Sequence, residues 1–225
     1  MASMSQLENH YAKDDVASIP TSPVAAAPAI ANPAPLGLCG FALTTFVLSL
    51  YNASAGVSAA TPPNVVVGLA LFYGGIAQLL AGMWEFKAGN TFGATAFSSY
   101  GAFWLSFATM LIPGSGILGA YADVPASELK HAQAIYLLGW TIFTGIMLVA
   151  SHRSSAGLVT LFFFLFITFL LLTIADFQNS APCKVAGGGF GVVTAIIAWY
   201  NALSALLNSE KQSLFQLPVM PLKRD

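Results

Sequence analysis

Charge is what this sequence has least of. Only 8% of its 225 residues are Asp, Glu, Lys or Arg, whereas 56% are hydrophobic. Soluble domains carry about 25% charged residues, so this chain has too few charges to cover a surface that faces water. The formal net charge of −1 also argues against a nucleic-acid partner, because no basic patch is present to neutralise phosphates. This composition predicts a membrane protein.

Patterns that carry enzyme chemistry or bind metals are missing as well. The sequence has no HExxH motif, no GxSxG motif and no pair of Asp residues inside an apolar stretch, so we expect no enzyme activity. Its two cysteines have no neighbouring cluster of histidines. We therefore expect no metal site and no cofactor.

Long apolar stretches are present, and six of them are long enough to cross a membrane, which takes about 20 residues of helix. Turn sequences such as TPPN and PGSG separate them. We expect an all-α membrane protein with a six-helix transmembrane transport domain over residues 32–210. A disordered cytoplasmic tail (1–31) precedes it, and a short cytoplasmic tail (211–225) follows. The longest loop, Pro113–Gln133, has room for a short interfacial helix. The expected spans are Leu36–Ala53, Val65–Trp84, Thr91–Ile112, Ala134–Ala150, Leu158–Ala175 and Val185–Leu207.

The Lys and Arg residues set the orientation of these spans. An even number of spans places both termini on one side, and six basic residues fall on that side against two on the other. We therefore expect both termini in the cytoplasm. Cys39 and Cys183 then lie a membrane thickness apart, which excludes a disulfide between them. The six residues are Lys13, Lys87, Arg153, Lys211, Lys223 and Arg224, and the two are Lys130 and Lys184.

Small residues form two regular stripes. The last span has Gly and Ala at spacings of three and four residues, and the second span has Gly at steps of seven. Such stripes let another helix backbone approach closely. Packing within one bundle and a subunit interface both remain open, and two stripes in so small a protein favour an oligomer. The stripes are Gly188, Gly191, Ala195, Ala198, Ala202 and Ala205, and Gly68, Gly75 and Gly82 with Gly89 just beyond.

Polar side chains inside the spans are candidates for a substrate path, because polar groups in hydrocarbon often mark function. Most Ser and Thr residues in a spanning helix bond to their own backbone, so singly each is more often structural. An amide such as that of Gln78 needs a partner in hydrocarbon. The candidates are Asn32, Thr44, Thr45, Gln78, Ser98 and Ser99.

Glu85 lies seven residues after Gln78, on the same helical face, at the cytoplasmic end of the second span. Two interpretations are open. The carboxylate reaches water beside Lys87, as long charged side chains do at membrane interfaces, or it relays a proton at the mouth of a pore.

The stretch NPAPLGLCGF, residues 32–41, opens the first span. Asn32 before Pro33 favours a turn, in which the Asn amide bonds to nearby backbone. Pro35 suits the first turn of a helix, where its missing N–H is not needed. The exposed helix start also offers unpaired N–H groups to an anion.

NPAPLGL, together with FYGGIAQLLAGMWEFKAGNTFGATAFSSYGAFW at residues 72–104, resembles the acetate uptake transporter family. That family includes bacterial acetate/succinate permeases and fungal acetate transporters linked to ammonia export. The similarity covers about residues 32–210 and includes the motif residues Pro33, Pro35, Gly37, Asn90 and Thr91.

The resemblance implies a hexamer of six-helix protomers, each with its own substrate path. It also implies a narrow hydrophobic gate formed by Phe41, Tyr100 and Leu165. Carried over, it predicts a multi-pass plasma-membrane transporter of acetate and similar short-chain monocarboxylates that moves its substrate with a proton. Membrane lipid surrounds such a protein.

The alternatives are an ammonia or passive anion channel and a membrane scaffold or sensor that transports nothing. A path lined by hydroxyls, one amide and aromatic rings suits a small solute that crosses nearly neutral, such as a weak acid or ammonia, because a desolvated charge is costly there. The residues do not distinguish symport from channel conduction, nor acetate from succinate.

Overall fold

The computed structural model describes residues 30–209 and 215–222. Within these residues the chain is helical, with one isolated antiparallel bridge between Ser155 and Pro221. The described residues from Ala31 onward belong to one compact unit. The expected tails at 1–31 and 211–225 lie outside the described residues, except for 30–31 and 215–222.

Long helical segments occupy each of the six places that the sequence predicts. Five of them are long and apolar enough to cross a membrane. The remaining one, α5, is long enough at 21 residues but less apolar, because Thr, Ser and Tyr interrupt it. The segments are α2 (Ala34–Asn52), the continuous run of α3 (Val66–Leu71), η1 (Phe72–Ala77) and α4 (Gln78–Lys87), α5 (Thr91–Leu111), α6 (Ala126–Ala150), α7 (Ala156–Gln178) and α8 (Ala181–Ser209).

The helix boundary that differs most from the prediction is the start of α6, at Ala126 rather than Ala134. Pro125 stands just before its first turn, and the two turns that follow, ASELKHAQ, are too polar for hydropathy to mark as helix. The expectation of a short interfacial helix in the loop Pro113–Gln133 is therefore wrong in part. The loop holds only two short 3-10 turns, η2 (Pro113–Ser115) and η3 (Gly119–Tyr121), and the rest is the beginning of α6.

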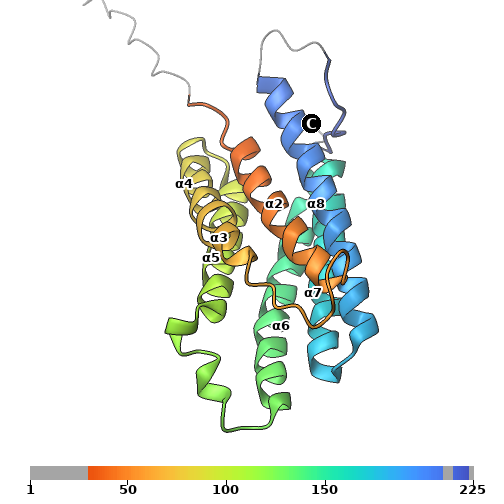
Figure 1. The fold of residues 1–225 in the computed structure, drawn as a ribbon. Coiled ribbons are helices and arrows are strands. Elements are labelled where there is room, and N and C mark those ends of the chain that lie inside the picture. The colour runs from red at the N-terminus through yellow and green to blue at the C-terminus, as the bar shows by residue number, and fades with distance from the viewer. Residues whose placement is uncertain (1–29, 210–214, 223–225) are drawn as a thin grey trace, which may run out of the picture. The chain divides into compact units, whose positions relative to one another are not determined.

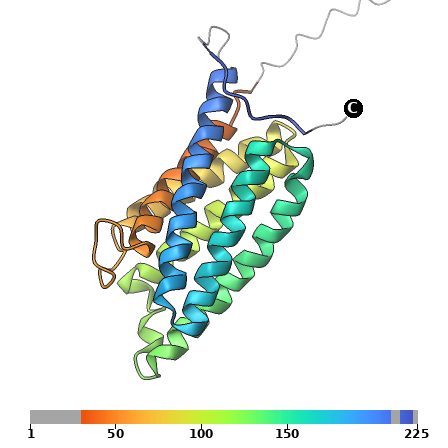
Figure 2. The ribbon, with the colours of Figure 1, turned by 90° about the vertical axis from the view of Figure 1, so that its right-hand side faces the viewer.

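The helices alternate in direction, so the start of α2 and the end of α8 lie at the same end of the bundle (Figure 1). α2, α8, α7 and α6 pack in series, each against the next, and α6, α7 and α8 run side by side (Figure 2). The α3–η1–α4 segment and α5 form a hairpin that packs on α2. α5 meets α6 and α7 through long aromatic side chains such as Tyr100 and Phe103.

The Gly and Ala stripe of α8 faces α2 within the same chain. A Cβ atom at Gly188 would lie 2.7 Å from the Ser49 carbonyl oxygen, and one at Gly191 would lie 3.0 Å from the Ser49 Cβ. Ala195, Ala198 and Ala202 continue the buried face. Of the two uses left open by the sequence, this stripe therefore serves packing within the protomer. Close approach of α2 and α8 depends on it.

A π-helical turn interrupts the second long segment at η1, a feature that periodicity does not predict. Its backbone lies directly on α2, since a Cβ at Gly40 would lie 2.6 Å from the Tyr73 carbonyl oxygen. A Cβ at Gly74 would likewise lie 2.8 Å from the Thr44 Cβ. π-Turns inside helices occur frequently at functional sites. Here the turn precedes Gln78 and shifts the face on which that residue lies.

Residues 215–222 return to the bundle at the end where α8 finishes. The Tyr200 hydroxyl donates to the Pro218 carbonyl oxygen at 2.7 Å, and the Ser204 hydroxyl donates to that of Leu217 at 2.8 Å. The Met220 carbonyl oxygen accepts from the backbone N–H of Ala156 at 2.9 Å. This segment thereby satisfies one of the N–H groups that the first turn of α7 leaves unpaired.

We expect Gly191→Leu to destabilise the protein and Gly189→Leu to leave its stability nearly unchanged. A side chain at Gly191 collides with Ser49 and Thr168, whereas a Cβ at Gly189 has no atom within 4 Å. Overpacking of this kind costs about 1–3 kcal/mol. Thermal unfolding of the two purified variants in the same detergent measures the difference. Equal stability of the two variants would show that α2 and α8 do not depend on this contact.

Candidate functional site

Two cavities lie between α2, α5 and α7. The larger, about 250 Å³, opens toward the end of the bundle where α2 finishes and α8 begins, and we call it the wide cavity. The smaller, about 80 Å³, lies toward the end where α2 begins and α4 finishes, and we call it the narrow cavity. Phe41 and Leu165 line both cavities, so these two side chains stand between them.

Tyr100 completes a ring with Phe41 and Leu165, the three residues that the resemblance assigns to a gate. The rings of Phe41 and Tyr100 meet edge to face with 5.7 Å between their centroids. The three side chains are only 5%, 3% and 2% exposed for Phe41, Tyr100 and Leu165. Tyr100 is held in place by a hydrogen bond of 2.9 Å between its hydroxyl and that of Thr144. The Tyr100 hydroxyl is thus engaged, and the three side chains are otherwise apolar.

The narrow cavity contains Glu85, whose side chain is 2% exposed. The interpretation that Glu85 reaches water beside Lys87 is therefore wrong. The Asn90 amide donates to Glu85 Oε2 at 2.8 Å, and the Asn90 side-chain oxygen accepts from the Gly93 N–H at 3.1 Å. Asn90 thus caps the start of α5 and fixes the carboxylate at the same time.

The other carboxylate oxygen of Glu85 is left over. Within the described residues Glu85 Oε1 has no hydrogen-bond partner, and neither does the Gln78 side-chain oxygen. Both residues line the narrow cavity, and Gln78 is 1% exposed. Buried polar groups are normally paired, so two unpaired acceptors beside one cavity indicate a place where water or a proton donor binds.

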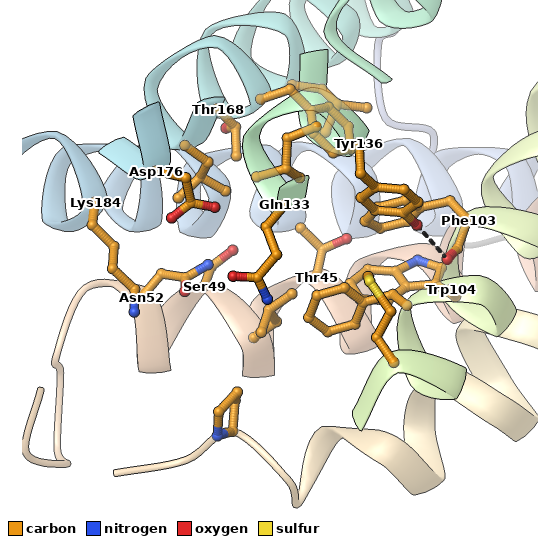
Figure 3. Close-up of a pocket in the computed structure, with 18 of the residues that line it drawn as sticks. Thr45, Ser49, Asn52, Phe103, Trp104, Gln133, Tyr136, Thr168, Asp176 and Lys184 are labelled. Atoms are coloured by element: carbon orange, nitrogen blue, oxygen red, sulfur yellow. Dashed lines mark hydrogen bonds between the residues drawn. The ribbon is translucent and has the colours of Figure 1, made fainter. Parts of the chain in front are cut away.

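The wide cavity also carries unpaired groups, and these can donate. Thr45 Oγ1 and Trp104 Nε1 are buried and have no partner among the residues that the structure describes. Both side chains line the cavity (Figure 3), and they follow Phe41 on α2 and Tyr100 on α5 by one helical turn each. An indole N–H and a hydroxyl are hydrogen-bond donors, and a carboxylate is an acceptor with two oxygens. Trp104 is a site residue that the sequence did not suggest, because a Trp in a span is ordinarily packing.

The outer part of the wide cavity is polar and charged. Asn52, Gln133, Asp176 and Lys184 lie together at one end, and Trp104 lies with other aromatic rings at the opposite end (Figure 3). The sequence did not single out any of these four residues. Asp176 follows the apolar stretch of its span by one residue, and Lys184 belongs to what looked like a loop.

Four of the six candidate path residues lie elsewhere. Asn32, Thr44, Ser98 and Ser99 line neither of the two cavities, whereas Thr45 and Gln78 do. Thr44 donates to the Gly40 carbonyl oxygen at 2.9 Å, the backbone bond that is common for Thr in a spanning helix. Asn32 accepts from the Ala34 N–H at 3.0 Å, which is the turn that the NPAPLGL sequence predicts.

The motif residues determine local structure near the two cavities. Gly37 lies against the ring of Phe97, with Phe97 Cγ 2.7 Å from where a Cβ would be. Pro33 and Pro35 stand at the start of α2, and Thr91 opens α5 directly after Asn90. The motifs thus set where α2 and α5 begin, and through Asn90 they position Glu85.

Among the described residues, the wide cavity thus has two unpaired groups that can donate, and the narrow cavity has two unpaired acceptors. A small carboxylate fits the donors of the wide cavity, and a proton or a protonated acid fits the acceptors of the narrow one. In the part of the chain that the structure describes, no group of three or more His, Cys, Asp or Glu residues could hold a metal ion.

Comparison with known proteins gives a consistent picture. A model of the GPR1/FUN34/yaaH family matches residues 18–224. The chain is 52% identical over 188 residues to "Ammonia transport outward protein 2" of Saccharomyces cerevisiae, a match that covers 84% of this chain and 66% of that protein. It is 48% identical over 198 residues to "Acetate permease A" of Emericella nidulans, covering 84% of this chain and 65% of the permease. The chain thus spans slightly less than two thirds of these relatives.

A solved structure, described as that of the bacterial acetate channel SatP, has a similar fold. The TM-score is 0.73 at 37% sequence identity, and the match covers 85% of this chain and 99% of the bacterial one. Almost the whole bacterial chain therefore corresponds to the helical bundle described above.

The two bonds of Asn90 can be separated by substitution. We expect Asn90→Ala to destabilise the protein by about 1–3 kcal/mol, because it removes a helix cap and the partner of a buried carboxylate. Asn90→Ser keeps a good capping side chain but cannot reach Glu85, so its loss should be smaller. Unfolding midpoints of both variants measure the order. A serine variant as unstable as the alanine variant would mean that the Glu85 bond accounts for the whole effect.

Proposed function

This chain belongs to the GPR1/FUN34/yaaH family, and on that premise we propose that it is a membrane transporter for acetate and similar short monocarboxylates. Each protomer has its own path, which runs from the wide cavity through the ring of Phe41, Tyr100 and Leu165 to the narrow cavity. The substrate crosses the ring together with a proton.

The observation that carries this proposal is the pair of unpaired donors in the wide cavity. Thr45 Oγ1 and Trp104 Nε1 are buried and unpartnered within the described residues, and each residue lies one helical turn from a ring residue. Leaving a buried donor unsatisfied costs about 1–3 kcal/mol, so a ligand that accepts from both is favoured there. The ligand must accept from these two groups and fit within about 250 Å³, and a small carboxylate can do both. Acetate meets both conditions.

The apolar ring supplies the reason for a proton. An ionised carboxylate at the ring loses its water and gains no fixed positive charge, which costs at least about 2.5–3.5 kcal/mol on the mildest scale. Acetic acid is neutral and avoids most of this cost. Carboxyl groups titrate near pH 4, so a fraction of the acid is available at mildly acid pH.

Glu85 is suited to handle that proton on the other side of the ring. Its unpaired oxygen and that of Gln78 belong to two residues that both line the narrow cavity. Tyr100 is the other titratable residue that lines this cavity, and its hydroxyl is bonded to Thr144. Glu85 can therefore accept a proton from the incoming acid and pass it on to water.

We propose that six segments cross the membrane, namely α5 and the five more apolar segments. α5 buries its aromatic side chains Phe97, Tyr100, Phe103 and Trp104 inside the bundle, and its 21 residues are long enough to cross. Both termini lie in the cytoplasm, as the Lys and Arg distribution favours. We further propose a hexamer in the plasma membrane, as the resemblance implies, with the 1–31 and 211–225 segments as cytoplasmic tails.

Ammonia is the second candidate substrate, because one relative is named for outward ammonia transport. The acceptors of the narrow cavity suit ammonia as a hydrogen-bond donor. The donors and the 250 Å³ of the wide cavity suit a carboxylate better. Competition between the two solutes distinguishes these candidates.

Uptake of radiolabelled acetate into proteoliposomes, with and without an imposed pH gradient, tests the proposal. Uptake that exceeds protein-free vesicles and is driven by the gradient supports symport. Flux that ignores the gradient supports a channel, and no flux above background supports a scaffold or sensor. Unlabelled ammonium that competes better than unlabelled propionate would favour the ammonia function.

The gate makes a prediction about size. We expect Leu165→Ala, Phe41→Ala and Tyr100→Ala to widen the ring and to raise uptake of a bulky acid such as benzoate, relative to acetate, by roughly tenfold. Leu138→Ala is the matched control, because Leu138 is exposed on α6 and lines neither cavity. The ratio of initial uptake rates is the measurement. An unchanged ratio in all three ring variants, at normal expression, would refute the assignment of the gate.

Glu85 makes a prediction about pH. We expect Glu85→Gln to flatten the rise of acetate uptake as the pH falls, because the amide cannot accept the proton, while folding and oligomer size stay normal. Glu128→Gln removes an exposed carboxylate at the start of α6 and should keep the wild-type profile. Should Glu85→Gln also keep it, proton coupling would belong to the substrate alone.

A further inference from the structure

The strongest feature outside the gate is the charged outer end of the wide cavity. We propose that this end is a capture site for a single carboxylate. There Lys184 binds the carboxylate with help from the Asn52 and Gln133 amides, and Asp176 rejects a second carboxylate on the same molecule. The inference rests on the proposed function and deepens it, because it makes this site select monocarboxylates over dicarboxylates.

The four side chains come from four different helices. Asn52 ends α2, Gln133 lies in the third turn of α6, Asp176 lies in the last turn of α7 and Lys184 in the first turn of α8. Side chains from four helices therefore converge on one end of one cavity (Figure 3). Such convergence of polar groups on a concave site is typical of ligand binding.

The backbone holds two of these groups rigidly. Asn179 ends α7 in the left-handed conformation, with φ of 50°, and the Ser180 N–H donates to the Ala175 carbonyl oxygen at 2.9 Å. This tight turn fixes Lys184 relative to Asp176. Gly188, one turn after Lys184, packs on the end of α2 and thereby fixes Lys184 relative to Asn52.

Asp176 and Lys184 also stand at helix ends where their charges are disfavoured. A cation in the first turn of a helix and an anion in the last turn are each disfavoured by the helix dipole. Lys184 and Asp176 occupy these positions. Charges placed against a local rule are most often explained by function.

The four side chains also remain available to bind a ligand. Across residues 30–209 and 215–222, no hydrogen bond or ion pair engages the side chains of Asp176, Lys184, Asn52 or Gln133. The Lys184 and Lys130 ammonium groups act on the Asp176 carboxyl group only through their fields. Lys130, the neighbouring cation, is instead bonded to the Asn179 side-chain oxygen and does not line the cavity. The exposed Lys184 ammonium group is therefore free to bind a carboxylate, as a capture residue requires.

The same arrangement discriminates by charge. A carboxylate that binds Lys184 gains a charge-assisted hydrogen bond. A dicarboxylate of similar length brings a second negative charge into a cavity that already contains Asp176. Like charges at close range repel strongly when partly desolvated. Monocarboxylates lack this second charge, so Asp176 repels them less.

The test uses the full chain in proteoliposomes, with labelled acetate as the transported probe and succinate as the competitor at pH 7.5. Lys184→Met should raise the KM for acetate by roughly tenfold with little change in maximal rate, as loss of a charge-assisted hydrogen bond implies. Asp176→Asn should lower the inhibition constant of succinate by roughly fivefold or more while the KM for acetate changes little. Lys130→Met, which removes an equal charge beside the cavity, should change both constants by less than about twofold.

A wild-type measurement covers the case in which a variant does not fold. The KM for acetate should rise with salt in the wild type, because capture by Lys184 is electrostatic. A KM independent of salt, or an unchanged succinate constant in Asp176→Asn, would overturn the capture site while acetate uptake itself continued. Absence of any acetate uptake by the wild type would instead refute the proposed function.

Discussion

A carboxylate that reaches the ring of Phe41, Tyr100 and Leu165 must give up its water, and nothing in the ring replaces it. The rest of the site is arranged around this cost. Donors that can bind the anion, Thr45 and Trp104, lie before the ring in the wide cavity, and acceptors that can take a proton, Gln78 and Glu85, lie after it. The unpaired buried groups therefore differ on the two sides of the ring, where we propose that the substrate is neutral.

The fold makes this arrangement possible by combining two kinds of packing. α2 lies backbone to backbone on α8 and η1, because Gly188, Gly191, Gly40 and Gly74 have no side chains to hold the helices apart. α5 instead contacts α6 and α7 through large rings such as Tyr100, Phe103 and Trp140. Side chains, rather than backbone, thus fill the space between α2, α5 and α7, and cavities remain on either side of the ring.

The sequence predicted much of the fold, because apolar stretches and turn sequences are direct consequences of a membrane environment. It missed the early start of α6, whose first turns are polar, and the π-turn at η1, which no periodicity announces. The ring residues came from family resemblance and not from spacing. Glu85 looked like a boundary residue, since a charge at the end of an apolar run ordinarily faces water. Its burial depends on Asn90 and the start of α5, which are contacts in space.

Asp176 and Lys184 show the same limit from the other direction. Each stands at the edge of an apolar stretch, where a charge carries no signal of its own, and only the tight turn at Asn179 brings them to one cavity. Likewise, no pattern in segment 215–222 predicts its backbone hydrogen bond to Ala156. Interactions between distant parts of the chain decide these features, and a single sequence does not display them.

The central claim is that the substrate is neutral at the ring, and the charge moved per acetate tests it most directly. Proteoliposomes on a sensor that records current would be exposed to an acetate gradient while a trapped dye reports the lumenal pH, with protein-free vesicles as the control. The account predicts protein-dependent acidification of the lumen with no accompanying current. A current carried by acetate without acidification would contradict it.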